Sequence, residues 1–149
     1  MYDHILIPTD GSELAHHGVE QGLSLAKALG SKVTIIIVTE PFPIRATATA
    51  AGWVASPDDF ATYEAGQKTF ADGVLATATA EAAKAGIEAD TLHVPDAWAA
   101  STIVETAQRL GSGLIVMASH GRRGFKRLLL GSQTAEVLAT ATIPVLVVR

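Results

Sequence analysis

Apolar residues follow two alternating patterns along the chain. Short, nearly continuous apolar runs are typical of strands buried on both faces of a parallel sheet. Between them lie longer segments in which apolar residues recur every three or four positions, as on one face of a helix. The clearest run is KVTIIIV at residues 32–38, which is β-branched at almost every position. The pattern therefore predicts alternating strands and helices.

The predicted elements number five strands and four helices. Strands are expected at 4–8, 32–38, 91–94, 113–118 and 143–148, and helices at 13–29, 60–85, 98–110 and 132–139. Gly30 and Gly86 follow two of the helices, where a left-handed residue commonly ends a helix. Residues 41–59 contain three prolines and have no clear period, so we expect a loop or flap there.

Strict alternation of this kind predicts the fold class and the place of a ligand site. We expect an α/β, Rossmann-like, doubly wound five-stranded parallel sheet with strand order 3-2-1-4-5. The 149 residues have the length of one domain, expected to span 1–149. Ligands of such sheets bind at the carboxyl ends of the strands, where the strand order switches. Asp10 and the segment 118–132 are therefore expected at one binding edge.

Composition narrows the possible functions. A net charge of −4 argues against a general nucleic-acid-binding protein, which usually carries a broad basic surface. The absence of cysteine excludes disulfides, thiolate catalysis and cysteine-bound zinc. We find neither a signal-peptide pattern nor an apolar run of the roughly 20 residues that a membrane span needs, so we expect a cytoplasmic protein without a membrane partner.

The segment ASHGRRGFKRLLLGS at 118–132 gathers small and cationic residues. It holds three glycines, two serines and four of the 11 lysines and arginines. Glycines let backbone N–H groups converge on a ligand, and a helix that begins near Ser132 offers free N–H groups to an anion. Phosphate is the expected ligand, although neither a Gly-x-Gly-x-x-Gly turn after the first strand nor a Walker A loop is present. From the residues alone, the cations either contact phosphate or form a solvated face, and Asp10 either binds the ligand or caps the first helix.

The whole chain resembles the universal stress protein family. The family's ATP-binding pattern is Gly, two residues, Gly, nine residues, then Gly-Ser or Gly-Thr, and Gly121, nine residues and Gly131-Ser132 match it. Ala118 stands at the first glycine position. If that glycine serves close approach rather than a positive φ, the extra methyl group is tolerated, and this is our expectation. The opening HILIPTDGSE and the closing TIPVLVVR are also similar to the ends of family members.

This resemblance implies ATP as the ligand and assigns roles to residues. The backbone at Gly121 and Gly131, together with Ser132, would hold the phosphates, Asp10 would bind the ribose hydroxyls, and the Val38 backbone would meet adenine. The expected ATP-binding residues are Pro8, Thr9, Asp10, Val38, Met117, Ala118, Gly121, Arg122, Arg123, Gly131, Ser132 and Gln133. Any magnesium would arrive with the nucleotide, because no protein metal site is expected. The resemblance also implies a homodimer through the apolar edge strand 143–148.

The expected function is that of a nucleotide-dependent binding module in a stress response. One alternative is an interaction protein of the same fold that binds no nucleotide. Another is a slow ATPase, but the glycine-rich segment contains no acidic pair to act as a base or to hold a metal. We therefore expect no catalytic residues and at most very slow hydrolysis.

Overall fold

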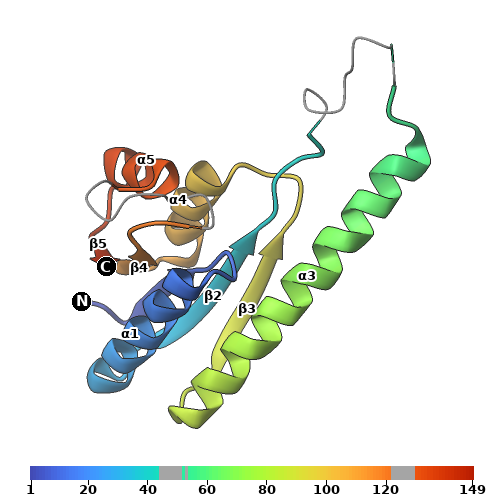
Figure 1. Cartoon of the computed structure of the whole chain (residues 1–149). Helices are drawn as coiled ribbons and strands as arrows, with labels where there is room; N and C mark the ends of the chain where they lie inside the picture. Colours follow the sequence, from blue (N-terminus) through green and yellow to red (C-terminus); the bar gives the residue numbers. More distant parts are fainter. Residues whose placement is uncertain (44–51, 53, 122–129) are drawn as a thin grey trace.

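The computed structural model describes residues 1–43, 52, 54–121 and 130–149. A five-stranded sheet forms its centre, and all paired strands are parallel. The strands are β1 (His4–Pro8), β2 (Lys32–Val38), β3 (Ala89–Val94), β4 (Leu114–Ala118) and β5 (Val145–Val148). Their order across the sheet is β3-β2-β1-β4-β5, so the predicted fold class and strand order are confirmed (Figure 1).

Helices cover both faces of the sheet. They are α1 (Glu13–Leu29), α3 (Pro57–Lys84), α4 (Ala99–Leu110) and α5 (Ser132–Thr140). Residues of α1 and α3 share one core cluster, and residues of α4 and α5 share the other, on the opposite face (Figure 1). Ile5 and Ile7 of β1 belong to the first cluster and Leu6 to the second. All three are fully buried, which explains why the strand has no polar position in its middle.

Helix α3 begins at Pro57 rather than at residue 60, so the predicted loop over 41–59 is too long. Ser56 Oγ accepts a hydrogen bond from Asp59 N–H at 3.3 Å, and the Asp59 carboxylate accepts one from Ser56 N–H at 2.7 Å. The bond from the Ser56 backbone also holds the pKa of Asp59 below its ordinary value. This capping box fixes the first turn of the helix, and proline fits well at its first position.

Three strands also differ in length from the prediction, and the smallest difference is in β4, which begins at Leu114 instead of residue 113. Strand β5 begins at Val145 instead of residue 143, because Pro144 accepts a hydrogen bond from Ile115 N–H at 3.0 Å but has no N–H of its own to donate. Strand β3 begins at Ala89 instead of residue 91. Its polar Asp90 is exposed on this edge strand and pairs in register with Thr34. The apolar residues alone therefore predicted a strand that is too short.

The chain on either side of residues 122–129 is fixed at the carboxyl end of β4. Ser119 N–H donates to the Val148 carbonyl at 2.7 Å, and Gly131 N–H donates to the Ser119 carbonyl at 2.8 Å. The buried Thr134 hydroxyl donates to the Ala118 carbonyl at 2.9 Å. These bonds place the beginning of α5 directly beside the end of β4, at the edge where the ligand is expected.

Candidate functional site

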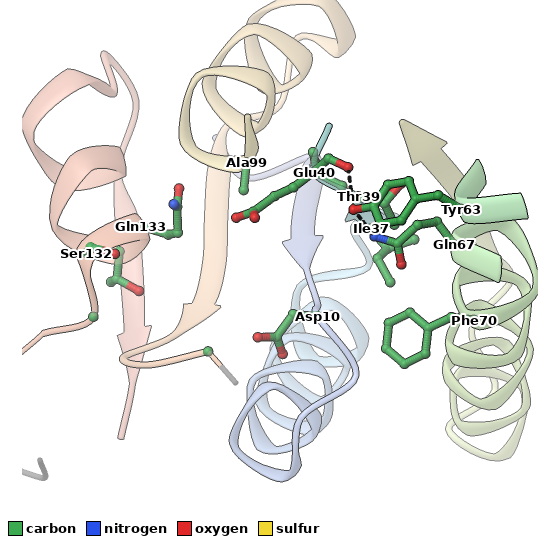
Figure 2. A pocket seen from close by; sticks show the side chains of 14 residues that line it. Asp10, Ile37, Thr39, Glu40, Tyr63, Gln67, Phe70, Ala99, Ser132 and Gln133 are labelled. Carbon is green, nitrogen blue, oxygen red and sulfur yellow. Dashed lines mark hydrogen bonds between the residues drawn. The ribbon is translucent and has the colours of Figure 1, made fainter. Parts of the chain in front are cut away.

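A cleft of about 350 Å³ lies at the carboxyl edge of the sheet (Figure 2). Its walls come from the ends of the inner strands, the first turns of α4 and α5, and one side of α3. The lining residues are Asp10, Ile37, Val38, Thr39, Glu40, Tyr63, Gln67, Phe70, Ala99, Gly121, Gly131, Ser132, Gln133 and Thr134. A smaller hollow of about 100 Å³ shares Asp10, Val38 and Gly121 with the cleft and extends it between β1 and β4.

The structure brings together all the expected site residues that it describes. Pro8, Thr9, Met117 and Ala118 line the smaller hollow, Gly131 and Ser132 line the cleft, and Asp10, Val38, Gly121 and Gln133 line both. Arg122 and Arg123 lie outside the described residues. Residues separated by more than 100 positions in the sequence therefore share one surface.

One end of the cleft is built from backbone and small residues. Gly131 is the N-cap of α5, and no side chain caps the helix there. The first N–H groups of a helix have no acceptor within it, so this end offers donors and the positive end of the helix dipole. A Cβ atom on Gly131 would lie 3.2 Å from His120 Cα and 3.3 Å from the Ser119 carbonyl oxygen. The glycine thus allows a close crossing of two backbone segments, and the resulting surface suits an anion.

Asp10 lies across the cleft from this helix end (Figure 2). Its Oδ1 accepts a hydrogen bond from Ser12 N–H at 3.0 Å, and Ser12 Oγ accepts one from Ala15 N–H at 3.1 Å. Ser12, not Asp10, is therefore the N-cap of α1. A Cβ atom on Gly121 would clash with Asp10 Oδ2, so a larger residue there would require the carboxylate to move.

Val38 presents its backbone at the other end of the site. Thr39 N–H donates to the Val94 carbonyl on β3 at 3.0 Å, whereas the Ile36 carbonyl accepts from Thr9 N–H on the opposite side at 2.9 Å. Alternate residues of β2 thus face alternate neighbours, and the peptide groups of Val38 face the β1 side. Because β1 ends at Pro8, the Val38 backbone extends beyond that ladder and borders the smaller hollow.

Ala118 has an ordinary strand backbone, and positive φ among the described non-glycine residues occurs at Asp96. The requirement for a positive φ at the first glycine position of the family pattern therefore does not apply here. Gly18 of α1 lies opposite, where a Cβ atom would approach Ala118 N to 3.1 Å. The missing side chain of Gly18 lets α1 approach the β4 backbone closely, and the Ala118 methyl group adds no clash there.

Gln133 has a partner that the sequence did not reveal. Its Oε1 accepts a hydrogen bond from Ala100 N–H at 3.1 Å, at the beginning of α4, where Trp98 provides no side-chain cap. The carboxamide therefore joins α5 to α4 across the floor of the site. Sequence reasoning also missed Tyr63, Gln67 and Phe70, whose spacing of four and three residues places them on one side of α3.

The described part of the chain holds no group of three or more metal-binding side chains that could bind a metal ion. Within the same residues, no helix is both long and apolar enough to span a bilayer.

Comparisons with known proteins agree with the fold. The sequence profile of the "Universal stress protein family" matches residues 1–149. Universal stress protein YxiE of Bacillus subtilis is 30% identical, with 100% of both chains covered. The solved structure of MJ0577 from Methanocaldococcus jannaschii is 26% identical with a TM-score of 0.82, covering 99% of this chain and 96% of that one.

A universal stress protein crystallised with cAMP shares the fold at 24% identity and a TM-score of 0.68, covering 99% of this chain and 97% of that one. The profile match over the whole length and the full-length relative decide the assignment. The chain belongs to the universal stress protein family.

Proposed function

We propose that this protein binds ATP in the cleft at the carboxyl edge of the sheet and acts as a nucleotide-dependent binding module in a stress response. One observation carries the proposal: the two ends of the site differ in chemistry, and Asp10 lies between them. The uncapped start of α5 with Gly131 forms one end, and the Val38 backbone forms the other, with Asp10 between them. ATP consists of a phosphate chain, a ribose and a base in the same order. The start of α5 suits the phosphates, Asp10 suits the ribose, and the Val38 backbone suits the base.

In this proposal each part of the site has one task. The N–H groups at the start of α5, the Ser132 hydroxyl and the backbone of Gly121 and Gly131 hold the phosphates, and Arg122 and Arg123 add positive charge. Asp10 accepts hydrogen bonds from the ribose. The base lies against Val38 and is enclosed by Pro8, Thr9, Met117 and Ala118, while Gln133 keeps α4 and α5 together. Magnesium enters with the nucleotide.

Three further points support nucleotide binding over a nucleotide-free protein. Ala118, the residue that departs from the family's glycine pattern, has a regular strand backbone. The universal stress protein with cAMP is a nucleotide complex on this fold. The cleft of about 350 Å³ also falls within the usual size of small-molecule sites. We further propose one domain over 1–149, located in the cytoplasm, whose partners differ between the ATP-bound and ATP-free states.

Mass spectrometry of the small molecules released by denaturing the purified protein tests the proposal. We expect an adenine nucleotide in the extract, and we expect intact ATP because the glycine-rich segment at 118–132 contains no acidic pair to act as a base or to hold a metal. An extract without nucleotide, from protein that also fails to retain added ATP on a desalting column, would contradict the proposal.

A further inference from the structure

Helix α3 contributes a row of three side chains to the cleft. Tyr63, Gln67 and Phe70 lie on one side of the helix and project toward Thr39 and Asp10 (Figure 2). They border the end of the cleft that contains Val38, not the end formed by α5. Val38 lines both this cleft and the smaller hollow, so a base that lies against Val38 has the cleft wall formed by α3 on one side.

Tyr63 is held firmly at this end of the cleft. Its hydroxyl donates to the Glu40 carbonyl at 3.0 Å, with the Pro41 carbonyl at 3.4 Å as a second acceptor. Its ring meets Phe42 edge-on with centroids 5.3 Å apart, and Phe42 in turn contacts Phe60 at 4.6 Å. These contacts fasten the first half of α3 to the segment that follows β2.

The fixed tyrosine determines how the Gln67 carboxamide is oriented. A phenol has one proton, and that proton is already directed to a carbonyl, so the Tyr63 oxygen can only accept from Gln67. The group 2.8 Å away is accordingly the Gln67 amide nitrogen, Nε2. Reversing the carboxamide would place its oxygen against the Tyr63 oxygen and lose this bond.

The rest of the carboxamide is available to a ligand. Gln67 is half-buried and lines the cleft, and no described residue bonds to its Oε1 or to its second N–H. A donor and an acceptor side by side match the edge of adenine, which presents the N6 amino group and the N7 acceptor. Guanine presents two acceptors, O6 and N7, at the same edge, so Oε1 would face O6 with no proton between them.

We propose that Gln67 reads the edge of the bound base and makes the site selective for adenine over guanine nucleotides. This inference rests on the proposed ATP binding. Tyr63 is the positioning residue, because it fixes which end of the carboxamide meets the base.

Calorimetric titration of Gln67→Met with ATP, GTP and inorganic tripolyphosphate tests the inference. Methionine keeps the length of the side chain and removes both hydrogen-bonding groups. We expect ATP affinity to fall roughly tenfold or more, with GTP affinity unchanged or higher and tripolyphosphate binding unaffected. Gln21→Met, at an exposed position on α1, is the matched control and should behave as the wild type.

A Gln67→Met variant that keeps the ATP-to-GTP affinity ratio of the wild type would overturn the inference. If this variant does not fold, Tyr63→Phe carries the same test, since it keeps the ring contacts but no longer fixes which end of the carboxamide meets adenine, so ATP affinity and the ATP-to-GTP ratio should fall. A wild-type protein that binds ATP and GTP equally refutes the inference alone. A wild-type protein that binds neither refutes the proposed function as well.

Discussion

A side chain at Gly131 would be crowded, because backbone atoms of His120 and Ser119 lie 3.2 and 3.3 Å from where its Cβ atom would be. Gly131→Val should therefore push the start of α5 away from the phosphates. We expect ATP affinity to fall at least tenfold, about 1.4 kcal/mol, in calorimetric titrations. Gly66→Val is the control, since this exposed glycine of α3 has no neighbour within 4 Å. Unchanged affinity in a folded Gly131→Val protein would remove the phosphate role from this segment.

Asp10 gives a second test by a single substitution, because the proposal assigns this residue to the ribose alone. Asp10→Ala should weaken ATP binding and leave the binding of inorganic phosphate unaffected in the same titration assay. Asp72→Ala, which removes an exposed carboxylate paired with Lys68 on α3, should change neither. Equal losses for ATP and phosphate in Asp10→Ala would refute the ribose assignment.

The sequence predicted some site residues and not others for a physical reason. Asp10, Gly121 and Gly131 were predictable because they follow strands or begin a helix, and strand ends meet at one edge of a parallel sheet. Gln67 was not, because a spacing of three or four residues occurs on every face of a long helix, and packing against β2 and β3 decides which face borders the cleft. The capping of Ala100 by Gln133 likewise depends on how two helices approach each other.

At the scale of the elements, a hydrogen bond of 2.8 Å joins His93 Nε2 on β3 to Thr39 Oγ1, just after β2. This bond near the site involves a titratable side chain, His93. Burial lowers the pKa of His93, the Asp72 carboxylate opposes this shift, and the Lys68 ammonium adds to it. The unfolded chain then binds more protons than the folded one at pH values just below the ordinary histidine pKa of about 6.5, so stability rises with pH there.

Lowering the pH from about 7.5 to about 5.5 should therefore destabilise the wild type more than His93→Gln, which cannot be protonated. The difference between their thermal unfolding midpoints, followed by circular dichroism, measures this effect. Midpoints that fall in parallel over the whole range would show that His93 does not contribute to the pH dependence.

Element boundaries were predictable where one local rule decides them. Helix α1 spans Glu13–Leu29 as predicted, because Ser12 caps its start and Gly30 adopts φ 69° at its end. The start of α3 was placed too late, although Ser56 and Asp59 form a capping box. The length of edge strand β3 depends on pairing with β2, which its own polar residues do not reveal.

At the scale of the whole molecule, the alternation of buried strands and helices was enough to predict the topology. Whether two copies of the chain form a dimer needs its own test. Strand β5 is an edge strand whose Leu146 is 43% exposed, and Leu138 of α5 is 41% exposed. Such an edge pairs readily with another strand. We propose that two copies of the chain meet there around a twofold axis.

Leu146→Lys should convert a dimer of the wild type to monomers in sedimentation velocity at micromolar concentration, by placing like charges opposite each other at the interface. Leu29→Lys, at an exposed leucine of α1, should leave the dimer intact. A wild-type protein that sediments as a monomer, with and without ATP, would show that β5 does not pair in this way.

Calorimetric titration of dialysed wild-type protein with ATP tests the central claim most directly, because it asks whether this cleft binds the nucleotide without relying on what survives purification. We predict saturable binding of one ATP per chain with a Kd below about 1 mM. A folded protein that gives no saturable heat at millimolar ATP would contradict the account.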